Sequence, residues 1–335
     1  MTIEAPVRWG LEAARSAPSA HNVQPWVFGV GGDAVALGWR RERELPHGDP
    51  QSRYLLIGLG AAAEGYALGR AVAGDRVAME FVWLPVDHQA ARLTVVPGSP
   101  EPLDVDLGRV LPYRQTSRGR FRRRAIAARG EAALTREAER LGCRLFIVTQ
   151  RRLMRRAARL TGRGTARNFS DRGVFAEFAE LLRMDRRDPA YERDGLTLET
   201  LATGRGQALA RRLVLRPGVM RVLSRLGLHQ VVARTQRRLA LQAAALALLV
   251  APSEERSDVF RGGRAMLRVW ARATWLGLRV HPMTAAMDHA ATRTSLTALF
   301  GVGADASPIV LFRLGYGKAG ARSPRLPLNE LVIRR

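Results

Sequence analysis

The chain has 335 residues, 47% of them hydrophobic, so it can bury a substantial core in one large or two medium domains. Cys143 is its only cysteine, which excludes a disulfide framework and a cysteine-ligated zinc or iron–sulfur site, and fits a reducing, cytoplasmic setting. The formal charge of +24 is almost all arginine, a pattern that codon bias in a GC-rich genome also produces. Because no helix-turn-helix, zinc finger or base-stacking motif accompanies it, we expect it to attract small anions and predict no nucleic-acid partner.

No segment has the pattern of a signal peptide or of a membrane span. Glu4 and Glu12 interrupt the first residues, which therefore lack the continuous apolar stretch of a secretory signal. The longest apolar run, Leu239 to Pro252, has about 14 residues, whereas crossing a bilayer takes roughly 20. We expect a buried element there.

The first third of the chain predicts the order helix, hairpin, helix, strand. Apolar residues recur at helical spacing from Ala5 to Arg15, and a proline soon afterwards ends the helix. Trp26 to Trp39 alternates around a Gly-Gly-Asp turn, which is typical of a β-hairpin. Arg53 to Val72 has helical periodicity, and Val77 to Leu84 has the pattern of a strand.

After a proline-containing connector (Pro97 to Pro102), a similar order begins again, which predicts two lobes of related plan. The expected elements are a helix at Ala132–Leu141, a strand at Arg144–Gln150, helix over Arg151–Leu182, a helix at Val259–Leu278 and a strand at Ile309–Leu314. Gly204 to Arg238 is amphipathic, rich in arginine and outside this repeat, so we expect an insertion.

A rigid polar loop runs from Pro18 to Trp26. Its prolines fix the backbone, so Ser19, Asn22 and Gln24 can present hydroxyl, amide and main-chain N–H groups to a ring rich in acceptors. The alternative is that these residues only close a helix-to-strand turn.

A second segment, Tyr113 to Phe121, places Arg114 and Arg118 on either side of Thr116 and Ser117. Guanidinium groups bind phosphate oxygens in bidentate fashion and hydroxyls complete the shell, so this spacing suits a phosphomonoester. The alternative is a solvated arginine run.

Two further segments have less specific patterns. Gly277 to Thr284 follows a long helix and is expected to be a turn that can aim a main-chain N–H at a redox centre, or a plain helix-to-strand connection. His281 within it has no second histidine at metal-ligand spacing and is expected at the surface. Arg322 to Pro327 is an extended tail that can reach another lobe.

Together these segments resemble the FMN-dependent nitroreductase family. The family's Pro-Ser-x-x-Asn-x-Gln-Pro-Trp loop corresponds to Pro18–Trp26, with Ala20 in place of a common second serine, and its Arg-x-Ser/Thr-x-Arg/Lys phosphate motif corresponds to Arg114–Arg118. The resemblance extends to Gly277–Thr284 and to Arg325–Pro327. It implies an α+β nitroreductase-like fold.

The order of the two motifs departs from ordinary members, in which the phosphate motif comes first and each flavin lies between two subunits. The reversed order resembles the Acg-type subfamily of actinobacterial proteins, whose single chain mimics the dimer. This implies an intramolecular pseudo-dimer with one site, made of a first lobe at 1–112 and a second lobe at 113–335. The second lobe would include a helical lid insertion at about 186–240 and a C-terminal arm.

The resemblance assigns the flavin contacts to both lobes. The implied cofactor-binding residues are Ser19, Ala20, Asn22 and Gln24 at the isoalloxazine, Arg114, Gln115, Thr116, Arg118 and Arg325 at the phosphate and ribityl chain, and Pro282, Met283 and Thr284 near the N5 side. FMN supplies the hydride chemistry in such proteins, so we nominate no catalytic side chain and no metal ligand.

Three hypotheses follow. The first is an NAD(P)H-dependent oxidoreductase that transfers hydride to a small nitro, quinone or enone acceptor. The second is a flavin-sequestering protein whose lid blocks access of the nicotinamide. The third makes Gly204–Arg238 a basic amphipathic helix that docks on anionic lipid or a partner. A monomer with an internal pseudo-dimer or a weak homodimer fits each of them.

Overall fold

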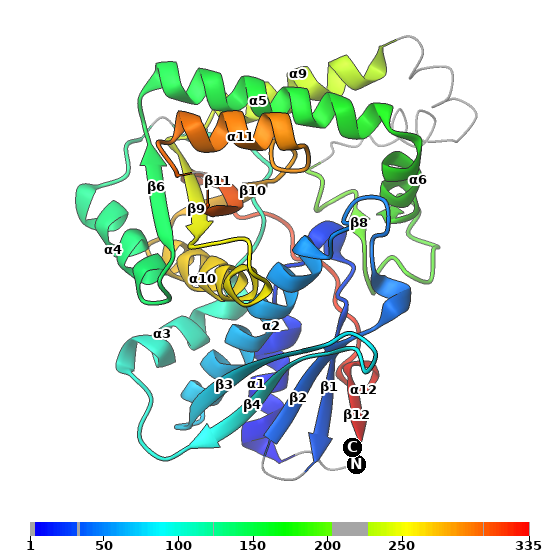
Figure 1. Ribbon diagram of the computed structural model, residues 1–335, viewed down its shortest axis with the longest axis vertical. Coiled ribbons are helices and arrows are strands. Elements are labelled where there is room, and N and C mark those ends of the chain that lie inside the picture. Colours follow the sequence, from blue (N-terminus) through cyan, green and yellow to red (C-terminus); the bar gives the residue numbers. More distant parts are fainter. Residues whose placement is uncertain (1–3, 32–33, 123, 203–226, 304, 335) are drawn as a thin grey trace.

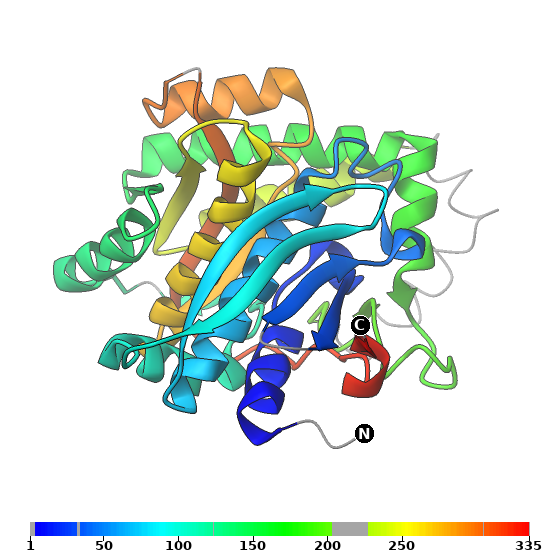
Figure 2. The same cartoon turned by 60° about the horizontal axis from the view of Figure 1, so that its bottom comes forward.

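The computed structural model describes residues 4–31, 34–122, 124–202, 227–303 and 305–334. Within them the chain folds into two lobes, each built on a mainly antiparallel sheet with helices packed against it (Figure 1). The expected α+β class is confirmed. The last described elements, α12 (Leu328–Leu331) and β12 (Val332–Arg334), lie beside the sheet of the first lobe (Figures 1 and 2).

The first lobe is a five-stranded sheet in the order β12-β1-β2-β4-β3, backed by helices. Its elements are α1 (Ala5–Arg15), β1 (Trp26–Gly31), β2 (Ala34–Trp39), α2 (Arg53–Val72), β3 (Arg76–Leu84), β4 (Gln89–Val96), α3 (Pro102–Val110), α12 (Leu328–Leu331) and β12 (Val332–Arg334). The short turns η1 (Ala20–Asn22), η2 (Arg41–Arg43) and η3 (Leu111–Tyr113) connect them. The hairpin predicted for Trp26–Trp39 is confirmed, since β1 and β2 pair from Trp26↔Trp39 to Gly31↔Ala34.

The second lobe is a sheet in the order β10-β11-β9-β6, with a short strand, β5, paired to β11. Its elements are β5 (Phe121–Arg122), α4 (Ala128–Glu139), β6 (Arg144–Val148), α5 (Arg151–Ser170), α6 (Arg172–Glu180), β7 (Leu182–Arg183), β8 (Leu196–Thr197), α9 (Leu228–Leu241), β9 (Ala245–Ala251), α10 (Arg256–Trp275), β10 (Arg279–Met283), α11 (Ala290–Leu299) and β11 (Ser307–Gly317).

Strand β9 forms half of the apolar run Leu239 to Pro252, which was predicted to be a buried element. All of its residues are buried, because successive side chains point to opposite faces of the sheet and helices cover both faces. Ala245, Ala247 and Leu249 face the core shared with α10, whereas Leu246 and Leu248 face the core under α5 and α11. A strand buried on both faces has no polar alternation.

The two lobes meet where α2 crosses α10. At this crossing a Cβ on Gly60 would lie 2.0 Å from the carbonyl oxygen of Phe260, and a Cβ on Gly263 would lie 2.1 Å from that of Ile57. Only glycine allows the two backbones to approach this closely. By length and composition α2 could also cross a bilayer, but 89% of that stretch is buried inside the protein, so it is the central core helix.

A buried ion network also joins the lobes. The Arg268 guanidinium of α10 donates to Glu64 of α2 at 2.8 Å, to Glu137 of α4 at 3.0 Å and to Asp104 of α3 at 2.6 Å. Arg264 donates to the second oxygen of Glu64 at 2.9 Å. Four helices are thus held by one set of charges, and one continuous hydrophobic core extends through both lobes.

The end of the chain returns from the second lobe to the first. After β11, an extended arm reaches β12, which pairs in parallel with β1 through Phe28↔Val332 and Gly29↔Ile333. The division at 112 and 113 stays a prediction, and in this topology the last strand completes the sheet of the first lobe. The arm also lies against the Pro18–Trp26 loop.

Several predicted elements differ from the observed ones. The predicted connector, Pro97–Pro102, runs from β4 to the first residue of α3, and neither of these two elements was predicted. Helix over Arg151–Leu182 is interrupted at Asp171, which adopts an extended conformation and caps α6 by accepting from Val174 N. Gly277–Thr284, predicted as a turn, is mostly strand β10, and only Gly277 has the left-handed φ of +72°. Residues 203–226, most of the predicted Gly204–Arg238 insertion, lie outside the described residues.

Candidate functional site

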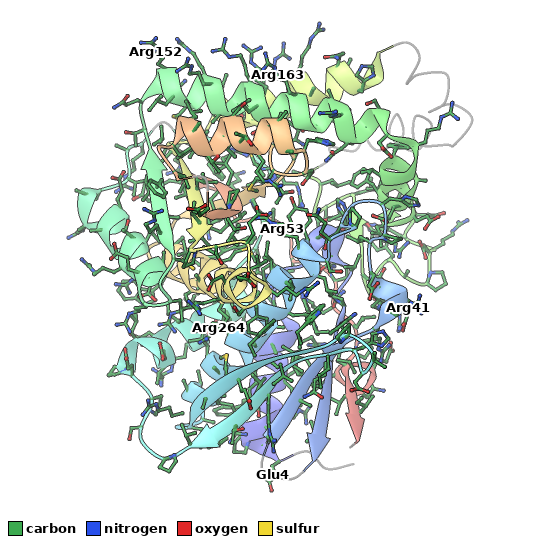
Figure 3. All side chains as sticks on the ribbon, viewed as in Figure 1. Glu4, Arg41, Arg53, Arg152, Arg163 and Arg264 are labelled. Atoms are coloured by element: carbon green, nitrogen blue, oxygen red, sulfur yellow. The ribbon has the colours of Figure 1, made fainter. Side chains whose placement is uncertain are left out.

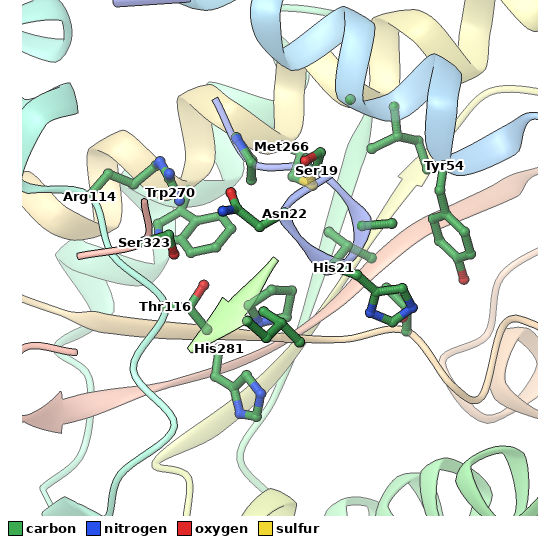
Figure 4. A pocket seen from close by; sticks show the side chains of 18 of the residues that line it. Ser19, His21, Asn22, Tyr54, Arg114, Thr116, Met266, Trp270, His281 and Ser323 are labelled. Atoms are coloured by element: carbon green, nitrogen blue, oxygen red, sulfur yellow. The ribbon is translucent and has the colours of Figure 1, made fainter. Parts of the chain in front are cut away.

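A cavity of about 830 Å³ lies where the two lobes meet, a size typical of small-molecule and cofactor sites (Figure 4). The predicted residues that line it are Ser19, Ala20, Asn22, Arg114, Gln115, Thr116, Arg118, Pro282, Met283, Thr284 and Arg325. The structure therefore brings together the loop of the first lobe, the arginine motif, the β10 segment and the C-terminal arm. Of the residues predicted for the site, only Gln24 does not line it.

The loop of the first lobe has an unusual backbone. His21, Asn22 and Gln24 all have positive φ, at 47°, 62° and 53°. Each such residue costs on the order of 1 kcal/mol or more unless its surroundings compensate. One compensating contact is local, because the Gln24 N–H donates to the Ser19 hydroxyl at 3.0 Å. A strained conformation held this firmly is typical of a ligand-binding loop.

The amide side chains of the loop clamp it to its surroundings. The Asn22 amide donates to the carbonyl oxygens of Gly195 and Pro324, and the Gln24 amide donates to that of Arg193 at 2.9 Å. The Gln24 Oε1 accepts from Leu326 N at 2.9 Å. Gln24 is fully buried behind the loop, so its amide fixes the backbone that faces the cavity and does not itself border the cavity.

Three arginines converge on the cavity without a carboxylate partner among the described residues. Arg114 is 7% exposed, donates to Ser16 O at 2.7 Å and stacks on Trp270, with its Cζ 4.4 Å from the ring centroid. Arg118 donates to Thr200 O at 2.7 Å, and Arg325 donates to Asn22 Oδ1 at 2.8 Å. All of these acceptors are neutral.

The electrostatics of this corner favour an anion. Burial, and to a lesser degree Arg325, lowers the pKa of Arg114 to about 9, and burial lowers the pKa of Arg118 to about 10. These groups remain cationic at neutral pH, so their desolvation is uncompensated. Buried polar atoms without a hydrogen-bond partner lie here too: Arg114 Nε, Arg325 Nε, Gln115 Oε1 and Ser117 Oγ. A phosphate would satisfy the donors among them.

The arginine motif is fixed beside strand β10. Thr116 forms an isolated bridge with Val280, and Ser117 N donates to Val280 O at 2.8 Å. The prediction that His281 lies at the surface is wrong: it is 5% exposed and lines the cavity. Burial, Arg118 and Arg313 hold its pKa well below the usual range, and its Nδ1 accepts from Arg313 at 3.4 Å, so the ring is neutral.

A polar cluster on another wall of the cavity was not predicted. The Tyr54 hydroxyl of α2 donates to Asp288, and Asn168 of α5 donates to the second carboxylate oxygen. Burial raises the pKa of Asp288. These residues are far apart in sequence and belong to no local motif, so the sequence carried no signal that joins them.

Helix α6 covers the cavity and was also not assigned to the site. Phe175 and Phe178 line the cavity, and the ring of Phe178 lies 5.1 Å from that of His21. The Glu177 carboxylate accepts from the backbone N–H groups of His47 and Gly48 at 2.9 and 3.0 Å. This contact holds α6, from the second lobe, against a loop of the first lobe.

The described residues contain no group of three histidines, cysteines or carboxylates that could hold a metal ion. The donor set of the cavity is instead cationic and amidic. It suits an anionic ligand that also presents an apolar or aromatic surface to Trp270, Met266 and the α6 phenylalanines (Figure 4).

Comparison with known proteins gave partial matches. No family model matches the chain. Two Mycobacterium tuberculosis proteins, from strains CDC 1551 and H37Rv and each named "Putative NAD(P)H nitroreductase", are 33% identical to it over 113 residues. That stretch covers 33% of this chain and a third of each relative's length.

Solved structures with similar chains include the FMN-dependent nitroreductase NfnB from Mycobacterium smegmatis in complex with NADPH, at 19% identity and a TM-score of 0.43. The match covers 67% of this chain and 96% of that one. An iodotyrosine deiodinase bound to FMN and 3-iodo-L-tyrosine matches at 14% identity and a TM-score of 0.39, covering 66% of this chain and 94% of its own.

Proposed function

We propose that the chain is a flavoprotein oxidoreductase of the nitroreductase family that holds one FMN in the interlobe cavity, and that its two lobes form an Acg-type intramolecular pseudo-dimer. The observation that carries the proposal is the convergence of Arg114, Arg118 and Arg325, without carboxylate partners, beside a strained polar loop. The names of the partly matching M. tuberculosis proteins support the same family.

The residues present fit such a cofactor. Arg114, Arg118 and Arg325 would hold its phosphate, because guanidinium forks match phosphate oxygens and the unpaired Nε atoms of Arg114 and Arg325 need acceptors. The clamped loop at Ser19–Asn22 would border the ring from the first lobe, and Pro282–Thr284 would border it from the second. FMN, when bound, supplies hydride transfer from NAD(P)H to a small nitro, quinone or enone acceptor.

The absorption spectrum of the purified protein tests the proposal. We expect a flavin spectrum with about one FMN per chain, since the arginine cradle occurs once in the described residues. The double variant R114Q/R118Q should contain at least tenfold less FMN per chain than the wild type, since each charged contact to phosphate contributes about 1.5–3 kcal/mol. The control R129Q/R136Q removes two exposed arginines of α4 and should keep the flavin. Equal flavin content in both variants would refute the site.

A second function, sequestration of the flavin without turnover, is favoured by the cover that α6 forms. The Glu177 contact and the aromatic side chains of Phe175 and Phe178 close the cavity from the second lobe. Anaerobic mixing with NADPH distinguishes the two functions, because an oxidoreductase bleaches within seconds and a sequestering protein stays yellow. If Glu177 blocks access, Glu177→Gln should speed bleaching, while Glu180→Gln, an exposed change on the same helix, should not.

A further inference from the structure

A face of exposed arginines covers the second lobe on the side away from the first. Helices α5 and α9 lie side by side there (Figure 1), and their inward faces belong to the core under the sheet. Their exposed arginines are Arg151, Arg152, Arg155, Arg156, Arg159, Arg163 and Arg167 on α5, and Arg234, Arg237 and Arg238 on α9. We call this set the arginine face. In Figure 3, Arg152 and Arg163 point away from the body of the protein.

The arginine face lacks acidic partners. The sequence has no aspartate or glutamate from Arg140 to Ser170 or from Thr200 to Ser253. Among the described residues, none of its arginines forms an ion pair, whereas several arginines elsewhere do, as Arg70 does with Asp75 at 2.7 Å. The positive charge of this side is therefore not balanced within the described structure.

Codon bias does not account for this pattern. It can replace lysine by arginine, but it does not remove acidic residues from two segments that pack together in space. Like charges four residues apart, such as Arg152 with Arg156 and Arg159 with Arg163, destabilise an isolated helix. A helix face that repeats such pairs of like charges is typical of a surface on which a bound polyanion relieves the repulsion between the cations.

We propose that the arginine face is a docking surface for an anionic phospholipid bilayer. Helix α5 alone is about 30 Å long, so with α9 it presents guanidinium groups along an extended front to phosphate headgroups. Apart from the exposed Val231 of α9, the described large apolar side chains of the two helices face inward, so the contact is electrostatic adsorption without insertion. The surface is independent of the proposed flavin site.

The described side chains favour lipid over nucleic acid. No exposed aromatic side chain on α5 or α9 offers a stacking platform for bases. Reading a duplex requires an element that enters a groove. These helices instead pack lengthwise against each other, with Gly162 of α5 close to Ala233 of α9, and α11 packs against α5.

Sedimentation of the full chain with vesicles tests the proposal. The vesicles contain phosphatidylcholine alone or mixed with phosphatidylglycerol, at about 0.1 M and about 1 M salt, where the Debye length falls from about 10 Å to about 3 Å. We expect binding only to the anionic vesicles and only at low salt. Duplex DNA and single-stranded RNA serve as competitors.

Matched variants connect the binding to the arginine face. The face variant changes Arg152, Arg156, Arg159 and Arg163 to Gln, a lysine version keeps the charge at the same positions, and the control variant changes the exposed Arg8, Arg41, Arg129 and Arg136 to Gln. Melting temperatures within a few degrees of the wild type show that each variant is folded.

The face variant should bind anionic vesicles about 600-fold more weakly than wild type, because it removes four arginines and each arginine near such a surface contributes about fivefold. The lysine version and the control variant should stay within about fivefold of wild type. The proposal is overturned if the wild type does not bind the vesicles, if the face and control variants lose affinity equally, or if a nucleic acid displaces the protein from the vesicles at equal phosphate concentration.

Discussion

The crossing of α2 and α10 leaves no room for a side chain at Gly60, and Gly60→Ala measures how tightly the lobes are joined. A Cβ there would lie 2.0 Å from Phe260 O and 3.1 Å from Arg264 N, whereas ordinary contacts begin at 3.4 Å. Both neighbours are backbone atoms, so no side-chain rotation relieves the clash. The helices must separate by about 1 Å or more, a shift of the size that overpacking produces.

The expected magnitude is a balance of two effects. Overpacking costs about 1–3 kcal/mol, and the upper end applies where backbone must move. Alanine in a helix recovers about 1 kcal/mol relative to glycine, which leaves a net loss of about 2 kcal/mol. For a chain of this length 1 kcal/mol corresponds to about 1–2 °C in melting temperature, so Gly60→Ala should melt about 3 °C lower.

Gly58→Ala in the same helix is the matched control, because a Cβ at this position would meet no atom closer than 3.8 Å. Since alanine favours a helix more than glycine does, this variant should melt about 1 °C higher than the wild type. Gly263→Ala on the facing helix should behave like Gly60→Ala, and the double variant should lose less than the sum because one separation relieves both clashes. If Gly60→Ala melts as high as Gly58→Ala, or if the two losses add fully, the close contact between the lobes is not what this geometry implies.

Three further measurements probe buried charge. Burial raises the pKa of Asp49 to about 6, so the folded chain binds the carboxyl proton of Asp49 more tightly than the unfolded chain does. The stability gained from this proton is greatest below pH 3.8 and is lost as the pH rises to about 6. Asp49→Asn should therefore flatten that part of a plot of melting temperature against pH. Burial, with Arg118, lowers the pKa of His21 from 6.5 to about 4, so the stability gained from the neutral ring is present above pH 6.5 and is lost as the pH falls to about 4. His21→Gln should remove this decrease of the melting temperature at low pH. Glu64→Gln should cost about 3–5 kcal/mol because it removes a buried partner of Arg268, whereas Glu101→Gln, in an exposed pair, should cost about 1 kcal/mol or less by denaturant titration.

Much of the fold could be predicted because the signals are local. The hairpin Trp26–Trp39 and the helix Arg53–Val72 follow from alternation and helical periodicity within single segments. Strand β10 could not be distinguished from a turn, because Gly277 and Pro282 break the local strand pattern. The pairing of Val280 with Leu314 on β11 decides its conformation, and that contact is distant in sequence.

The candidate site divides in the same way. The loop and the arginine motif were predictable because proline, amide and guanidinium groups at fixed spacing restrict what a segment can bind. The role of Gln24 was not predictable, because an amide that faces a ligand and an amide that holds the loop from behind have the same sequence signature. Only its complete burial and its hydrogen bond from Leu326 N separate the two cases.

The C-terminal arm ties the site to the fold as a whole. Arg325 donates to the Asn22 side chain and to the carbonyl oxygens of Ser16 and Ala17, so the same residue that faces the cavity also holds the strained loop. Its position is set on one side by β11 in the second lobe and on the other by β12 in the first sheet. The cavity is therefore complete only when both lobes and the arm are in place, which links formation of the site to folding of the entire chain.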